Sequence, residues 1–192
     1  GLKYSCLGGH KELVLLMIEK GADNWNEGLV NACLGGYKEL VLLMIEKGAN
    51  DWNNGLACAC NGGHKELVLL MIENGANDWN FGLAMACNRG NKEILLLMIE
   101  KGANDWTSGL RNACLGEHKE LVLLMIEKGA DIIYCRMKLT INDIEYLYKK
   151  GVRTLYNYNV QVEQYKKILQ QVQESLDNLD SFRDIVKICM EY

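Results

Sequence analysis

Residues 28–54 read GLVNACLGGYKELVLLMIEKGANDWNN, and close copies of this stretch make up most of the chain. The leading Gly-Leu recurs at a constant step of 27 residues, at Gly1, Gly28, Gly55, Gly82 and Gly109. Five copies therefore cover residues 1–135, and only a few positions differ between them. A fixed period of this length is the signature of a repeat architecture, in which each unit packs on its neighbours.

Each copy predicts two helices. In the copy at 28–54, Leu29, Ala32 and Cys33 fall on one apolar face of a short first helix, which the glycines at 35–36 end. The second helix is expected over about 37–47, followed by a stop at Gly48 and an Asn-Asp loop that caps the next helix. Apolar residues cover more than half of its circumference, so it must touch neighbours on both sides. Stacked pairs can bury such a surface, and the pattern predicts an all-α solenoid.

The copies resemble ankyrin repeats. The resemblance rests on GGHKELVLLMIEKGA, with Gly-His at the start of the second helix and Lys-Gly-Ala at its end, and on GLxxAC in the first helix. The copies are shorter than the ~33 residues of an ankyrin repeat, and the missing residues fall in the loop that usually carries a β-hairpin finger. The usual Thr-Pro-Leu-His is also absent. The resemblance implies an ankyrin-like α-solenoid of five helix-pair repeats without fingers, similar in style to short arrays of large DNA viruses.

The periodicity changes after Asp131. Thr140 is expected to open a helix that runs through Lys150 and stops at Gly151, a degenerate half-repeat suited to a cap. We therefore divide the chain into five repeats at 1–135 and a C-terminal helical cap at 136–192. A further helix over about 160–179 is expected to pack on the open end of the array or on the last helix, with dimerisation as the alternative. It would do so through an a/d seam of Val162, Tyr165, Leu169, Val172, Leu176 and Leu179. A last helix is expected after Asp180-Ser181.

Composition and charge exclude several classes of protein. Apolar residues make up 49% of the 192 residues and charged residues 24%, which is typical of a folded chain. The net charge of −4 offers no basic surface to nucleic acid or to an anionic membrane. The longest apolar run has six residues, whereas a transmembrane helix needs about 20. The first residues are not a signal peptide and lack an initiator Met, so we expect a fragment.

Five of the eight cysteines recur once per copy. Stacked helices lie about 8–10 Å apart, whereas a disulfide needs Cα atoms within about 7 Å, so neighbouring copies should not be bridged. We interpret these cysteines as small buried apolar residues, and the remaining three form no zinc-binding spacing. This favours a reducing, cytoplasmic location. The recurring cysteines are Cys6, Cys33, Cys60, Cys87 and Cys114, and the others are Cys58, Cys135 and Cys189.

Other residue types also recur at a fixed offset. The histidines His10, His64 and His118 give way to Tyr37 and Asn91 in the other copies, which does not suit a metal or catalytic site and favours bonding to loop backbone. The Asn-Asp loop pairs hold too few carboxylates for calcium and are interpreted as helix caps. Four tryptophans are expected to cover the junction between copies, with an exposed aromatic ridge as the alternative: Trp25, Trp52, Trp79 and Trp106.

A leucine ladder occupies the solvent side of the second helices, where Glu39 and Glu46 also lie in the copy at 28–54. Either the neighbouring copy covers each leucine, or an apolar stripe runs along the convex face and binds a partner. We favour coverage by the neighbouring copy. The ladder consists of Leu15, Leu42, Leu69, Leu96 and Leu123.

Differences between the copies mark a candidate binding surface. They cluster at three offsets of the first helix and at the copy boundary, which holds Glu27, Asn54, Phe81, Ser108 and Cys135. The first-helix positions point away from the core, so we expect them on the concave face, where solenoids usually bind partners, although drift at unconstrained positions explains them equally well. The candidate partner-binding residues are Lys3, Tyr4, Val30, Asn31, Ala57, Cys58, Asn61, Ala84, Met85, Asn88, Arg111 and Asn112.

The sequence contains no recognisable catalytic constellation. We find no phosphate loop, no paired carboxylates in an apolar setting, and no Ser or Cys with a fixed His partner. We therefore predict a non-enzymatic protein–protein interaction module with no cofactor or metal, whose partner is another protein and not nucleic acid or a membrane. The alternatives are an assembly protein, joined through the leucine ladder or the C-terminal helices into a homo-oligomer, and, more weakly, a substrate adaptor for a ubiquitin ligase.

Overall fold

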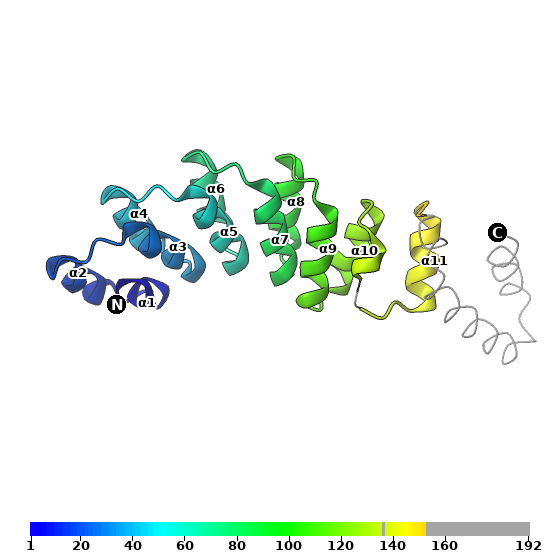
Figure 1. Ribbon diagram of the computed structural model, residues 1–192, viewed down its shortest axis with the longest axis horizontal. Helices are drawn as coiled ribbons and strands as arrows, with labels where there is room; N and C mark the ends of the chain where they lie inside the picture. The colour runs from blue at the N-terminus through cyan, green and yellow to red at the C-terminus, as the bar shows by residue number, and fades with distance from the viewer. Residues whose placement is uncertain (136, 153–192) are drawn as a thin grey trace, which may run out of the picture. The chain divides into compact units, whose positions relative to one another are not determined.

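The computed structural model describes residues 1–135 and 137–152. The described residues form eleven α-helices and one short 3-10 helix, and residues 1–151 make one compact unit (Figure 1). The first helices of the copies are α1 (Leu2–Leu7), α3 (Trp25–Gly35), α5 (Trp52–Gly62), α7 (Trp79–Arg89) and α9 (Trp106–Leu115). The second helices are α2 (Lys11–Glu19), α4 (Lys38–Glu46), α6 (Lys65–Glu73), α8 (Lys92–Glu100) and α10 (Lys119–Glu127). They are followed by η1 (Ile132–Tyr134) and α11 (Ile141–Lys149).

The prediction of two helices per copy is confirmed, but the first helix begins earlier than expected. Helix α3 starts at Trp25, before the Gly-Leu pair, and has 11 residues against nine in α4. The residue before each tryptophan serves as the N-cap, as expected of the Asn-Asp loops. The Asp78 carboxylate accepts a hydrogen bond from the Phe81 N–H at 3.0 Å, and Asp105 caps α9 in the same way. Helices α3 and α5 begin at the same position without a side-chain hydrogen bond from their N-cap residues.

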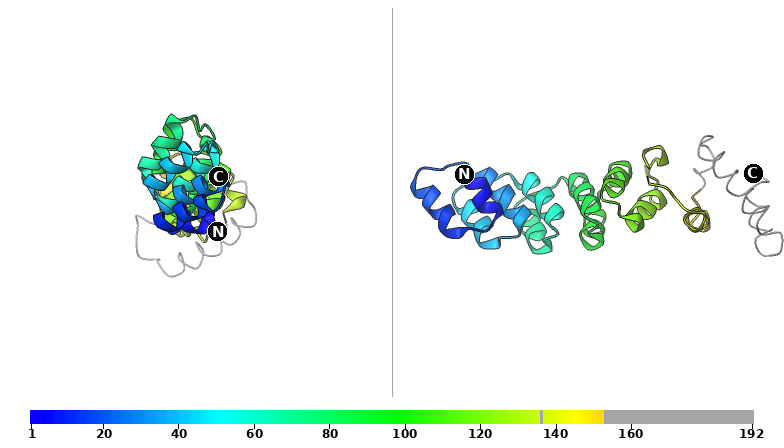
Figure 2. Two further views of the ribbon diagram at one scale, coloured as in Figure 1. Left: turned by 90° about the vertical axis from the view of Figure 1, so that its left-hand side faces the viewer. Right: turned by 90° about the horizontal axis from the view of Figure 1, so that it is seen from below.

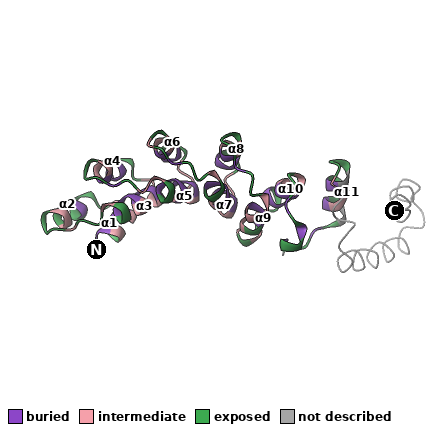
Figure 3. Ribbon diagram, turned by 45° about the horizontal axis from the view of Figure 1, so that its top comes forward, coloured by how far each residue is buried: buried purple, intermediate pink, exposed green. Residues whose placement is uncertain are grey.

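The helix pairs stack in sequence order (Figure 2) and form two layers, the first helices in one and the second helices in the other (Figure 3). Successive first helices pack closely against one another, whereas successive second helices stay further apart. Because the first-helix layer has the shorter spacing, residues 1–151 bend toward it, and the first helices lie on the inner side of the bend (Figure 3).

The core lies between the two layers and is built from the same positions in each copy. Leu29, Ala32 and Cys33 have no solvent exposure, which confirms the predicted apolar face of the first helix. From the second helix, Val41 and Met44 are equally buried. The core is therefore made of residues that hardly change between copies, so each copy presents nearly the same surface to the next.

The recurring cysteines are buried, as expected. Cys6, Cys33, Cys60 and Cys87 have no solvent exposure, and all four are free thiols. Burial raises the pKa of the Cys33 thiol to about 12, because the thiolate would lose its hydration in the core. The fifth, Cys114, is half-buried, and its Sγ lies 3.9 Å from the Sγ of Cys135.

Three kinds of polar contact join one copy to the next. As expected, histidine bonds to backbone, because the His64 ring Nε2 lies 3.2 Å from the Leu34 carbonyl oxygen of the preceding copy. The other two kinds were not foreseen. The Asn26 Oδ1 accepts hydrogen bonds from two backbone N–H groups of the next loop, at 2.7 and 3.1 Å, and Asn53 and Asn80 repeat this contact. Lys11 pairs with Glu39 at 2.8 Å, and the same pairing recurs along the second helices.

The tryptophans stand at the first position of α3, α5, α7 and α9. Their side chains are half-buried, so each ring is partly covered and partly in contact with solvent. The exposure of the rings is therefore intermediate between the expected packing at the junction of the copies and the alternative of an exposed aromatic ridge.

The expectation that neighbouring copies cover the leucine ladder is wrong for four of its members. Leu42 is 46% exposed and Leu96 47%, and Leu15 and Leu69 are exposed as well, while Leu123 is half-buried. The reason is the bend, because it spreads the second helices apart and leaves the side chains on their outer side without a neighbour.

Helix α11 follows Thr140, as the sequence predicts, and ends at Lys149, one residue before the expected end. The Asp143 carboxylate accepts hydrogen bonds from the Thr140 N–H at 2.7 Å and from the Thr140 hydroxyl at 2.6 Å, and Gly151 follows the helix with a φ of 85°. The Lys119 Nζ lies 2.8 Å from the same carboxylate and ties α11 to α10. Although burial opposes it, these hydrogen bonds lower the pKa of Asp143. The division at 135/136 stays a prediction, and the helices expected over 160–179 and after 180 lie outside the described residues.

One residue has a backbone conformation that glycine adopts in the other copies. Glu117 has a φ of 59° at a position held by Gly36, Gly63 and Gly90 in the three preceding copies. We expect Glu117→Gly to raise the free energy of unfolding by about 1 kcal/mol, because a left-handed backbone strains residues that have a Cβ. Urea denaturation measures the change. Gly63→Ala is the matched control and should lower stability by a similar amount, and a destabilised Glu117→Gly variant would contradict the expectation.

Candidate protein-interaction surface

Many of the residues that differ between copies share one face of the first helices, which form the inner layer of the bend. On α5, Asn54, Cys58 and Asn61 are separated by four and three residues and share one helix face. The equivalent residues of the other first helices lie on the same side, and none of them is buried. We call this set the inner stripe: Tyr4, Leu7, Glu27, Asn31, Leu34, Asn54, Cys58, Asn61, Phe81, Met85, Asn88, Ser108, Asn112 and Leu115.

Most of the predicted site residues fall on or beside this stripe. Seven of them belong to it: Tyr4, Asn31, Cys58, Asn61, Met85, Asn88 and Asn112. Lys3, Val30 and Arg111 occupy the neighbouring offset and are half-buried or exposed. Ala57 and Ala84 share that offset but are only 2% and 4% exposed, so these two candidate residues offer little surface to a partner. Both lie in first helices that pack closely against their neighbours.

The predicted site omits the first residue of the inner stripe in each copy. Glu27, Asn54, Phe81 and Ser108 vary between copies, but we assigned them to the boundary because the first helix was expected to begin later. Their variation was the signal that could have placed them. With the helix starting at the tryptophan, each lies four residues before a predicted site residue and on the same face.

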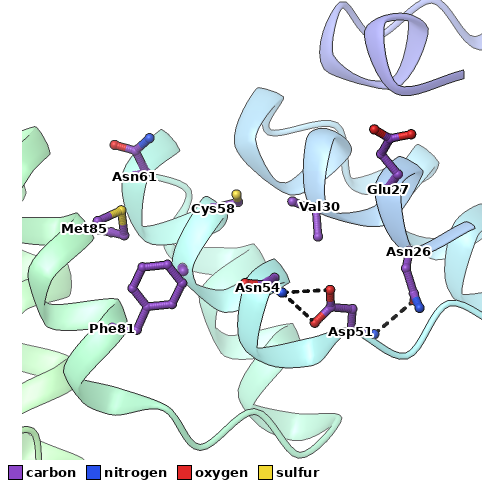
Figure 4. A pocket seen from close by; sticks show the side chains of 10 residues that line it. Asn26, Glu27, Val30, Asp51, Asn54, Cys58, Asn61, Phe81 and Met85 are labelled. Atoms are coloured by element: carbon purple, nitrogen blue, oxygen red, sulfur yellow. Dashed lines mark hydrogen bonds between the residues drawn. The ribbon is translucent and has the colours of Figure 1, made fainter. Parts of the chain in front are cut away.

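The stripe is hollowed where α3, α5 and α7 meet. A pocket of about 420 Å³ opens there (Figure 4). Val30, Ala57 and Met85 give it an apolar floor, together with the ring of Phe81, which is 40% exposed. The full lining consists of Asn26, Glu27, Val30, Asp51, Asn54, Ala57, Cys58, Asn61, Phe81 and Met85.

The polar groups of the pocket lie mainly toward α3 and the start of α5 (Figure 4). The Glu27 Oε1 pairs with the Lys3 Nζ at 3.1 Å, and this hydrogen bond raises the pKa of Lys3. The Asp51 carboxylate accepts hydrogen bonds from the Asn54 amide at 2.9 and 3.1 Å. Burial raises the pKa of the Cys58 thiol, and the nearby charge of Asp51 raises it further. The ten lining residues thus include two carboxylates and no lysine or arginine.

Two further searches of the described residues concern metals and membranes. Within residues 1–135 and 137–152, no three His, Cys, Asp or Glu side chains come together in a way that could hold a metal ion. In the same part of the chain, every helix is too short or too polar to cross a bilayer.

Comparison with known proteins identifies the fold. No protein-family model and no curated protein matches the sequence. Among solved structures, the chain is similar to the crystal structure of the human ASB11 ankyrin repeat domain, with a TM-score of 0.58 and 21% identity over 79% of this chain and 83% of that one. The chain has the ankyrin-repeat fold. Its ankyrin units are short, since only residues 47–51 separate α4 from α5, which leaves no room for a hairpin finger. The likeness to viral arrays stays a prediction.

Proposed function

We propose that this chain is a protein-interaction module that uses its inner stripe to contact a partner protein. One observation carries the proposal: the side chains that differ between otherwise near-identical copies gather around a pocket on the inner side of the bend. A pocket with an apolar floor and a polar rim is the usual form of a recognition site. The ankyrin-repeat fold supports an interaction role in general.

Two histidines and three cysteines that could in principle serve catalysis have structural uses, which supports a non-enzymatic role. The ring nitrogens of His64 and His118 lie within hydrogen-bond distance of backbone carbonyls of the preceding copies. The Cys33, Cys60 and Cys87 thiols are buried, and their raised pKa values keep them protonated and unreactive at neutral pH.

Binding would use a surface that is already in place. Each copy is tied to the next by the core, by the asparagine and histidine contacts and by Lys–Glu pairs, so the inner stripe is held on a rigid scaffold. A rigid site loses less conformational entropy on binding than a flexible one. We further propose a reducing location such as the cytoplasm, because the seven cysteines in the described residues are free thiols.

The test uses substitutions that the array already tolerates elsewhere. The position of Phe81 in α7 is held by Asn54 in α5, and the position of Met85 is held by Asn31 in α3. The double variant Phe81→Asn, Met85→Asn should therefore fold normally. Ligands would be selected from a displayed library of random 12-residue peptides on the wild-type chain, and their affinities measured by fluorescence anisotropy.

We expect the Phe81→Asn, Met85→Asn double variant to bind the selected peptides at least tenfold more weakly, because it removes the large apolar groups of the pocket. The control Leu69→Asn, on the outer face, should leave affinity unchanged. Affinities within twofold of wild type, in a double variant with an unchanged circular dichroism spectrum, would refute the inner stripe as the site.

The exposed leucine ladder favours assembly as a second candidate function. Leu42, Leu69 and Leu96 form an apolar row on the outer face, and exposed apolar patches often mark contacts between proteins. Self-association through this row predicts a mass that rises with concentration in light scattering. The ubiquitin-ligase adaptor alternative has no support among the described residues and stays a prediction.

The triple variant Leu42→Glu, Leu69→Glu, Leu96→Glu separates the two functions. We expect it to fold with a loss of less than about 0.5 kcal/mol per site, because surface substitutions change stability little. We also expect the wild-type chain to be monomeric over a hundredfold range of concentration. A wild-type dimer that the triple variant converts to a folded monomer would favour assembly, and an unfolded variant would contradict the exposure of the ladder.

A further inference from the structure

The pocket on the inner stripe has two chemically different ends. The Phe81 ring and the Met85 thioether come from α7 and lie at one end, and the Glu27 carboxylate lies at the other, on α3 (Figure 4). Asp51 lies between them at the start of α5. A ligand that fills the pocket therefore meets an apolar surface and carboxylates on opposite sides.

The apolar end is open to a bulky side chain. Phe81 is 40% exposed, and the whole pocket, of which this end is a part, has a volume of about 420 Å³. Covering an exposed phenylalanine together with Met85 gives an apolar anchor most of its binding energy. The thioether of Met85 adapts to anchors of different shape, such as leucine, methionine or phenylalanine.

The other end favours a positive charge. Glu27 has one counter-ion, Lys3, and this pair is exposed, so an incoming cation can join or replace it. The Asp51 carboxylate is hydrogen-bonded by the neutral amide of Asn54, which leaves its charge uncompensated among the lining residues. The five copies as a whole carry 12 basic and 17 acidic residues, so the long-range field also attracts cations.

Two amide side chains of α5 suit a peptide backbone. Asn54 and Asn61 both line the pocket. The Asn54 amide N–H groups already donate to Asp51, so Asn54 offers its Oδ1 as an acceptor, whereas Asn61 offers both donors and acceptors. Neighbouring first helices lie about 8–10 Å apart, and an extended segment advances about 3.3 Å per residue. A side chain on α7 and a charge near α5 are therefore spanned by about three residues.

We propose that the pocket receives an extended protein segment in which a bulky apolar side chain is anchored against Phe81 and Met85, with a lysine or arginine within about three residues directed at Asp51, on the side of the pocket that also holds Glu27. This inference rests on the proposed function and specifies the chemistry of its partner. An acidic segment would bring like charges together, and a segment without an apolar anchor would leave the apolar end in contact with water.

The experiment reads the sequences selected from the random 12-residue library and then removes each charge in turn. We expect the enriched peptides to contain a lysine or arginine within three residues of a bulky apolar residue more often than the unselected library. In the strongest ligand, replacing that basic residue by Gln should weaken binding at least fivefold in 50 mM salt, with a smaller effect in 500 mM salt.

The matched variants again use residues found in other copies. The position of Asp51 is held by Asn24 in the preceding copy, and the position of Glu27 is held by Asn54 in the next, so the variants are Asp51→Asn and Glu27→Asn. We expect this double variant to lose at least fivefold in affinity for the basic peptide and less than twofold for its Gln version. The control Glu39→Gln, which removes an outer-face carboxylate paired with Lys11, should change neither.

The outcomes separate this inference from the proposed function. Enriched peptides without a basic bias, or equal losses for the basic and Gln peptides, would overturn the charge proposal while binding to the inner stripe stands. If no peptides are enriched, or if those enriched are insensitive to Phe81→Asn and Met85→Asn, both the inference and the proposed function fail.

Discussion

Substitution of Gly62 by alanine is expected to lower the free energy of unfolding by about 2 kcal/mol, although alanine normally favours a helix over glycine. Gly62 ends α5, and a Cβ at this residue would lie 2.4 Å from the Cδ2 of His64 and 2.5 Å from the Leu34 carbonyl oxygen. The methyl group would displace the His64 ring from the carbonyl to which it bonds, so contact with the preceding copy would be lost.

The fourth copy indicates how the loss can be repaired. It carries Arg89 in place of this glycine, and at the position of the histidine it carries Asn91, whose side chain caps its own helix by accepting from the Ile94 N–H at 3.0 Å. In each copy that has a histidine or tyrosine at this position, the residue two before it is a glycine. Adding His64→Asn to Gly62→Ala should therefore restore at least half of the lost stability in urea denaturation. A double variant no more stable than Gly62→Ala would contradict this coupling.

Raising the pH from 8 to 10 is expected to lower the free energy of unfolding by about 2 kcal/mol for each fully buried thiol of the inner repeats. In the folded chain, burial raises the pKa values of Cys33, Cys60 and Cys87 to about 12. In the unfolded chain they titrate near the ordinary value of about 8.5. Above that value the unfolded state releases protons that the folded state keeps, so stability falls as the pH rises toward 12.

A single substitution isolates this effect from that of other titrating groups. Cys60→Ala removes one buried thiol, so the stability of this variant should fall less steeply with pH than that of wild type. Between pH 9 and 10 the two slopes should differ by about 1 kcal/mol per pH unit. Urea denaturation at pH 8, 9 and 10 gives both slopes. The surface Lys–Glu pairs also weaken at high pH, but they contribute equally to the two chains and cancel in the difference. Equal slopes would mean that the thiol is not buried in the folded state.

Local features of the fold could be predicted because one 27-residue pattern is repeated. The apolar face of Leu29, Ala32 and Cys33 follows from helical spacing, and the helix stops follow from glycines. The start of the first helix could not be placed in the same way, because Gly28 looks like a boundary but lies inside α3. The Asn26 contact was missed for the same reason, since it needs the helix to begin at Trp25.

Side-chain exposure that depends on the spacing between copies could not be predicted from the periodicity of the sequence. The position of Leu42 on its helix was predictable, but its exposure depends on how far α4 and α6 spread on the outer side of the bend. Ala57 follows the same logic on the inner side, where closely spaced first helices cover it. The sequence therefore predicted a candidate site on the same first helices as the inner stripe, but with a shifted set of residues, which left out Phe81.

One set of residues builds the array, and we propose that a different set, the inner stripe, contacts a partner. This division is tested most directly by giving α5 and α7 the inner-stripe residues of α3, which the fold already accommodates. The substitutions are Asn54→Glu, Cys58→Asn, Asn61→Leu, Phe81→Glu, Met85→Asn and Asn88→Leu. The measurement is the affinity of this chain for peptides selected on wild type, beside its unfolding midpoint in urea. We expect an unchanged midpoint and at least a tenfold loss of affinity. Undiminished affinity in a folded chain would contradict the account.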